Sequence, residues 1–171
     1  MKDLKKVIEE MINSGEYSPR LCGALNLIVE DKMNSIEFDK YLAQQYISVR
    51  DIKIETLKVI IDYANICLED DLLAEQELLN IRMLKYFLKI KEGDFIKYGK
   101  KQDVREVLLY QLRKMYNDDI IDKDEALMKN DLQSLFDLSY DQFLEIVNEV
   151  AQESIERGAE MGNLDTFILP K

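Results

Sequence analysis

The stretch LSYDQFLEIVNEVAQESI, residues 138–155, decides the fold class of this chain. Its aliphatic residues return at the spacing that places them on one face of a helix. Ser139 and Gln142 form the Ser-x-x-Gln pattern of a capping box, in which each side chain accepts from a backbone N–H at a helix start. The stretch therefore predicts a long amphipathic helix that opens at Ser139.

The same apolar spacing recurs through the rest of the chain. It predicts further helices over residues 3–13, 18–29, 35–47, 52–67, 69–93, 102–115 and 127–136. Ser18 and Pro19 suit the N-cap and the first position of the helix that they open. The chain holds only two prolines and six glycines, which favours long helices over strands and turns. We predict an all-α fold, a compact bundle of about seven to eight helices.

The length of 171 residues suits one domain over residues 1–161, followed by a tail over residues 162–171. The acidic turn near Glu30 resembles the turn near Asp118, and two helices follow each, so two pseudo-repeated helical halves stay open. No apolar run has the length of a membrane span or of a signal-peptide core. Cys22 and Cys67 lack a CxxC partner and are expected as free thiols. We expect a cytoplasmic protein.

Charge is distributed unevenly along the chain, whose net charge is −11. Residues 117–165 hold 14 acidic and 3 basic side chains, whereas residues 82–114 hold 10 basic and 4 acidic ones. The acidic third should repel nucleic acid and anionic lipid, and attract cations or a basic protein. We therefore expect no nucleic-acid partner.

The acidic loop over residues 117–125 is the one constellation that resembles metal chemistry. Closely spaced carboxylates suit hard divalent cations such as calcium or magnesium. The spacing does not fit an EF-hand, because Ile121, Asp122 and Met128 occupy positions that need other residue types. The alternative is an acidic helix N-terminus favoured by the helix dipole. The candidate ligands are Asp118, Asp119, Asp122, Asp124 and Glu125.

A basic stretch over residues 85–105, interleaved with aromatic residues such as Phe95 and Tyr98, suggests binding of phosphates or of single-stranded nucleic acid. The alternative is a solvated or internally paired helix face. The candidate phosphate-binding residues are Lys97, Lys100, Lys101 and Arg105.

Catalysis has little support in the sequence. The chain has no histidine, so the usual general base near neutral pH and any Ser-His or Cys-His pair are missing. It also has no GxxxxGK[ST] loop and no GxGxxG turn. We expect a protein that is not an enzyme and carries no cofactor, with calcium or magnesium at the acidic loop as the alternative.

The acidic turn over residues 118–125, followed by a helix and the Leu138-Ser139 turn into another helix, resembles the TerB-like domain of tellurite-resistance and stress-associated proteins. The family has a glycine after the acidic residue, where this chain has Ile120. The resemblance covers the C-terminal third only. It implies an all-helical, membrane-associated or complex-forming accessory module whose acidic face binds divalent cations.

Together these features predict a non-catalytic interaction or regulatory protein in stress or defence, such as an immunity-type inhibitor of a basic toxin. Its acidic C-terminal face would steer a basic protein partner onto it. A TerB-like cation-binding module and a structural subunit or homo-oligomer are the alternatives. The expected partner-binding residues are Asp131, Asp137, Asp141, Glu145, Glu149, Phe167, Ile168 and Leu169.

Overall fold

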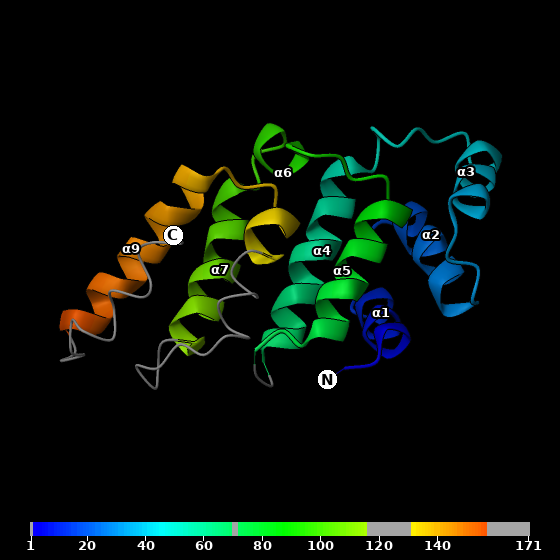
Figure 1. The fold of residues 1–171 in the computed structure, drawn as a ribbon. Helices are drawn as coiled ribbons and strands as arrows, with labels where there is room; N and C mark the ends of the chain where they lie inside the picture. Colours follow the sequence, from blue (N-terminus) through cyan, green and yellow to red (C-terminus); the bar gives the residue numbers. More distant parts are fainter. Residues whose placement is uncertain (1, 70–71, 116–130, 157–171) are drawn as a thin grey trace. The chain divides into compact units, whose positions relative to one another are not determined.

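The computed structural model describes residues 2–69, 72–115 and 131–156. Every regular element in these residues is a helix, which confirms the all-α prediction (Figure 1). The chain divides into two compact units, Met1–Tyr98 and Gly99–Lys171. We expected one domain over residues 1–161, so the structure adds a boundary at Tyr98 that the sequence did not indicate.

Six helices are described in the N-terminal unit. They are α1 (Leu4–Asn13), α2 (Pro19–Val29), α3 (Ser35–Gln44), α4 (Lys53–Leu68), α5 (Glu75–Phe87) and α6 (Asp94–Lys97). The basic stretch over residues 85–105 contains a short helix, α6, because Gly93 adopts a left-handed backbone that turns the chain into it. The expected helix over residues 69–93 is shorter at both ends, as α5.

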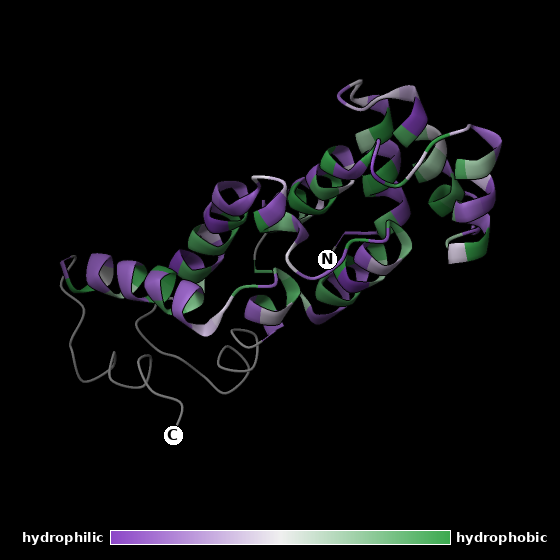
Figure 2. Cartoon of the chain, turned by 90° about the horizontal axis from the view of Figure 1, so that it is seen from above, coloured by the Kyte–Doolittle hydropathy of each residue, from purple (hydrophilic) through white to green (hydrophobic). Residues whose placement is uncertain are grey.

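The core of this unit forms around α4, which packs against α1 and α5. Four apolar residues of α4 leave almost no accessible surface: Leu57, Ile60, Ala64 and Cys67. The α3 helix reaches the same core through Phe38, whose ring centroid lies 5.0 Å from that of Phe87 on α5. Hydrophobic and hydrophilic residues alternate around the helices (Figure 2), as amphipathic elements require.

The N-cap side chain satisfies the backbone at three of the described helix starts of this unit. Asp3 and Ser18 accept from N–H groups of the first turns of α1 and α2, as their positions predict. The N-cap of α3 is Asn34, directly before the expected helix start at residue 35, and its Oδ1 accepts from the N–H groups of Ile36 and Glu37. Asparagine is among the strongest N-cap residues, because its side-chain oxygen accepts from the free N–H groups of the first turn.

The C-terminal unit holds α7 (Lys101–Met115), a helical turn over residues 131–135, and α9 (Tyr140–Glu156). The capping box is confirmed: Ser139 N–H donates to Gln142 Oε1 over 3.0 Å, and Gln142 N–H to Ser139 Oγ over 3.2 Å. Helices α7 and α9 pack together through buried aliphatic residues such as Leu108 and Val147.

Among the helices that the structure describes, none combines the length and apolarity that a membrane span requires. Cys22 and Cys67 are free thiols, as predicted. Burial, reinforced by the charge of Glu77, raises the pKa of the Cys67 thiol to about 12. Cys67 is therefore a protonated core residue at neutral pH.

Candidate functional site

A hollow of about 580 Å³ in the N-terminal unit gathers cationic side chains, and we call it the basic hollow. Five cationic residues and a single carboxylate line it, together with one aliphatic and one aromatic side chain. The lining residues are Val49, Arg50, Lys53, Lys89, Lys91, Asp94, Lys97 and Tyr98.

Three segments of the chain meet at the basic hollow. The loop that follows α3 supplies Arg50, and the first residue of α4 is Lys53. The turn between α5 and α6 supplies Lys89 and Lys91, and α6 follows directly. This turn forms because Lys89 takes a left-handed backbone with φ 53° at the C-terminal end of α5. Residues distant in sequence thus share one hollow.

A buried ion pair between Lys53 and Asp94 forms part of the lining. Lys53 Nζ lies 3.0 Å from Asp94 Oδ2, and the two side chains are only 6% and 10% exposed. The same ammonium donates to the carbonyl oxygen of Lys89 over 2.6 Å. A lysine ammonium has three donors, so one remains without an acceptor among the described residues. Lys53 is therefore held in place at the basic hollow by two acceptors, and its third N–H can donate to a ligand.

Asp94 is charged at neutral pH. Burial alone would raise the pKa of its carboxyl group, but two contacts outweigh burial and lower that pKa. These are the hydrogen bond from the Lys91 N–H, 2.9 Å long, and the ion pair with Lys53. The basic hollow therefore contains a permanent carboxylate among a larger number of cations.

The other cations of the basic hollow are closer to solvent. The Lys89 ammonium pairs with Asp39, and the Lys97 ammonium lies 5.4 Å from the centroid of the Tyr98 ring. Within the described ranges, no carboxylate forms an ion pair with the exposed side chains of Arg50, Lys91 or Lys97. The hollow consequently carries an excess of positive charge that a ligand anion can neutralise.

The structure separates the four predicted phosphate-binding residues. Lys97 lines the basic hollow, whereas Lys100 pairs with Asp103 at the start of α7 over 2.7 Å. Lys101 and Arg105 line a different hollow, of about 390 Å³, within the C-terminal unit. Arg105 also forms an ion pair there with Glu149. Sequence reasoning missed Arg50 and Lys53, because no local pattern shows that the start of α4 meets the turn after α5.

The predicted partner-binding residues of α9 fall into two groups. Asp141 and Glu145 are exposed, whereas Glu149 is engaged by Arg105 of α7. One turn further along, Glu153 accepts two hydrogen bonds from Arg113, of 2.6 and 2.8 Å. These ion pairs connect α7 to α9, so arginines of α7 neutralise part of the acidic charge of α9.

The remaining predicted site residues are placed as follows. Asp131 is partly buried at the start of the 131–135 turn, and Asp137 follows this turn with φ 57°. The candidate metal ligands Asp118, Asp119, Asp122, Asp124 and Glu125 lie outside the described residues, as do Phe167, Ile168 and Leu169. In the part of the chain that the structure describes, no group of acidic or cysteine residues is arranged to hold a metal ion.

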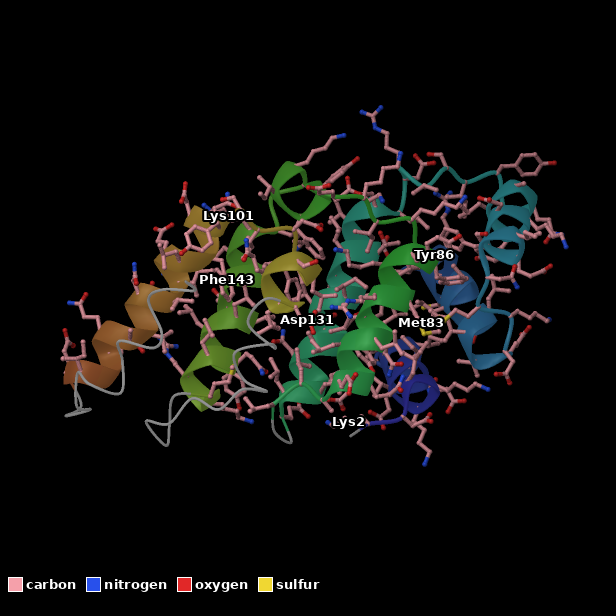
Figure 3. The ribbon with its side chains drawn as sticks, in the orientation of Figure 1. Lys2, Met83, Tyr86, Lys101, Asp131 and Phe143 are labelled. Atoms are coloured by element: carbon pink, nitrogen blue, oxygen red, sulfur yellow. The ribbon has the colours of Figure 1, made fainter. Side chains whose placement is uncertain are left out.

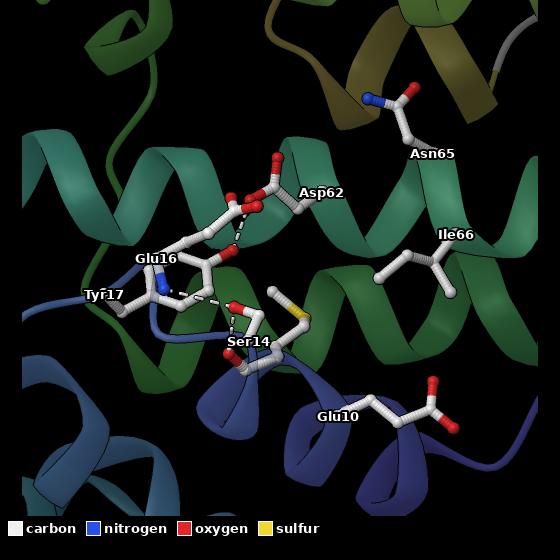
Figure 4. Close-up of a pocket in the computed structure, with 8 residues that line it drawn as sticks. Glu10, Ser14, Glu16, Tyr17, Asp62, Asn65 and Ile66 are labelled. Atoms are coloured by element: carbon white, nitrogen blue, oxygen red, sulfur yellow. Dashed lines mark hydrogen bonds between the residues drawn. The ribbon is translucent and has the colours of Figure 1, made fainter.

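A second hollow of the N-terminal unit, of about 270 Å³, lies between α1 and α4 (Figure 4). The Tyr17 hydroxyl donates to Asp62, whose carboxylate also pairs with Lys58. Burial, followed by the bond to Asp62, raises the pKa of Tyr17. Lys58 pairs with Glu16 as well, over 2.7 Å. These groups satisfy one another, which indicates a structural network.

An apolar row lies on the exposed side of α5. It consists of Leu79, Met83 and Tyr86, of which Tyr86 is 74% exposed. Figure 3 shows Met83 and Tyr86 on this helix. Tyrosine and methionine are enriched in protein interfaces, so this row is a second surface to consider.

The basic hollow is thus the described site with the most specific chemistry. No protein-family model, curated protein or solved structure matches the chain, so its function is inferred from the residues of the site.

Proposed function

We propose that this chain is a non-catalytic binding protein whose N-terminal unit takes a small phosphate-bearing ligand in the basic hollow. The observation that carries this proposal is the convergence of five cationic side chains on one hollow, with Lys53 buried and fixed. Protein sites of this kind bind phosphate because lysine and arginine supply charge-assisted hydrogen bonds to its oxygens.

The buried pair supports this role physically. A flexible lysine loses side-chain entropy when it binds an anion, whereas Asp94 and the Lys89 carbonyl already hold Lys53 in place. Arg50, Lys91 and Lys97 then supply mobile charges nearer to solvent. A fixed donor with a mobile basic rim is an arrangement suited to capture an anion and orient it.

Isothermal titration calorimetry with pyrophosphate at fixed ionic strength and pH 7.5 tests the proposal. We expect binding that weakens as salt is added, because the contacts are partly exposed. Arg50→Gln and Lys97→Gln should each weaken binding about tenfold, the loss of ~1.4 kcal/mol that a hydrogen bond to a charged group provides.

Lys40→Gln is the matched control for these variants. It removes the same charge from an exposed lysine of α3 that pairs with Glu37 and does not line the hollow. Its affinity should equal that of the unchanged chain. Equal losses in all three variants would mean that only net charge matters, and the proposed site would be abandoned.

Binding of a protein partner is a second candidate, favoured by the apolar row on α5. Leu79, Met83 and Tyr86 have the i, i+4, i+7 spacing that packs against a partner's apolar helix face. Sedimentation velocity at rising concentration tests a second copy of the chain as that partner. A dimer that Met83→Ser with Tyr86→Ser dissociates would support it, and a monomer throughout would exclude the second copy.

A further inference from the structure

We infer that the ligand of the basic hollow is a nucleoside phosphate, with its phosphate on the cations and its base against Tyr98. This inference rests on the proposed function and names the ligand class. Three features of the hollow carry it: its size, its aromatic wall and its single carboxylate.

The size of the hollow leaves room for an occupant larger than inorganic phosphate. Small-molecule sites span roughly 300–1,000 Å³, and the basic hollow, at about 580 Å³, falls within that range. A single phosphate group fills only a small part of such a volume. The hollow can therefore hold a sizeable ligand portion besides the phosphate.

The wall of the hollow suits a flat ring. Tyr98 and Val49 are half-buried apolar surfaces among the cations, so they can cover a ligand portion that carries no charge. Stacking of a base on an aromatic side chain adds roughly five- to 150-fold in affinity. The Lys97 ammonium lies 5.4 Å from the Tyr98 ring centroid. When a base stacks on Tyr98, the phosphate joined to that base through a sugar is therefore within reach of Lys97.

Asp94 distinguishes this hollow from a site for phosphate alone. A carboxylate repels phosphate but accepts hydrogen bonds from hydroxyl groups. Asp94 Oδ2 pairs with the Lys53 ammonium and accepts a hydrogen bond from the Lys91 N–H. Asp94 Oδ1 accepts no hydrogen bond from the described residues. The ribose of a nucleotide provides hydroxyl donors between base and phosphate, which matches an acceptor beside the cations.

Calorimetry on the full chain, with chelator present, compares ADP with pyrophosphate and ribose 5-phosphate at pH 7.5. We expect ADP to bind at least about tenfold more tightly than either, the effect of one stacked base. Tyr98→Leu should remove this advantage and leave pyrophosphate affinity unchanged. Tyr98→Phe keeps the ring and should retain the advantage, which separates stacking from damage to the fold.

The possible failures can be told apart. If pyrophosphate binds as tightly as ADP, the nucleoside inference is overturned and the anion site stands. If ribose 5-phosphate matches ADP, the base makes no contact and a sugar phosphate replaces the nucleotide. If none of the three binds, both the inference and the proposed function are overturned.

Discussion

Within the described residues, four helical segments end at a residue other than glycine that holds a left-handed backbone. These residues are Asp31, Tyr46, Lys89 and Asp137. In each case two backbone hydrogen bonds close the turn; after α3, for example, Tyr46 N–H donates to Ala43 and Ile47 N–H to Leu42. This is the Schellman motif, whose left-handed position usually belongs to glycine. At Lys89, glycine would lack the side chain that lines the basic hollow.

Tyr46 provides a test of this backbone strain. It is 97% exposed, so its ring contributes little packing. Tyr46→Gly should raise the free energy of unfolding by about 1 kcal/mol, because a left-handed backbone costs an L-residue roughly that much. Urea denaturation measures the difference. Tyr46→Ala keeps a Cβ and should show no comparable gain; an equal gain would point to the tyrosine ring instead of the backbone.

At the scale of helices, the starts that carry a side-chain capping pattern were predicted correctly. Ser18 with Pro19 and Ser139 with Gln142 are side-chain patterns with a direct mechanism, and the structure has helices beginning there. The end of α5 was predicted near Gly93, but Lys89 ends the helix without a glycine signal. The apolar pattern continues through Leu88 and Ile90 into the turn, so periodicity alone could not locate that end.

The capping box of α9 should be measurable in stability. Ser139→Ala removes the acceptor for the Gln142 N–H and should lower the free energy of unfolding by about 1 kcal/mol. Ser139→Asp keeps an acceptor at the same place and should retain most of the stability. Far-ultraviolet circular dichroism during urea titration reports both. If Ser139→Ala and Ser139→Asp lower the free energy of unfolding by the same amount, the Ser139 hydroxyl does not act as a cap.

At the scale of the whole molecule, the sequence predicted the fold class and part of the basic site. Charge counts indicated a basic region over residues 82–114, and Lys97 does line the hollow. Counts could not show that Lys100 and Arg105 have carboxylate partners, or that Arg50 and Lys53 join the hollow from another segment. Partner binding through Asp141 and Glu145, and the TerB-like module, stay predictions.

The buried pair gives the molecule a defined response to acid. The pKa of Asp94 is lowered in the folded chain, so ionised Asp94 contributes to the free energy of unfolding. This contribution is fully present above the unfolded pKa near 3.8, and it is lost as the pH falls through the folded pKa. The chain has no histidine, so stability should change little between about pH 5 and 8. Urea midpoints across pH 2–8 should therefore be flat at first and then fall steeply below about pH 4.

Asp94→Asn checks the source of that response. It leaves the Lys53 ammonium buried without its counter-ion, and breaking such a pair costs about 3–5 kcal/mol at neutral pH. The acid dependence of the variant should also be shallower. Lys53→Met with Asp94→Leu removes both charges and should recover much of the loss. A single variant as stable as the unchanged chain would contradict a structural role for the pair.

The boundary at Tyr98 makes the basic hollow, the proposed ligand site, separable from the rest of the polypeptide. Every lining residue of the basic hollow belongs to Met1–Tyr98. A truncated protein that stops after Tyr98 and has an amidated C-terminus, which adds no negative charge beside the hollow, should therefore unfold cooperatively and bind pyrophosphate with the affinity of the full chain. At that size, amide chemical-shift mapping by NMR could follow the titration residue by residue. The chain would then consist of two units that fold independently, of which the N-terminal unit alone binds the anion.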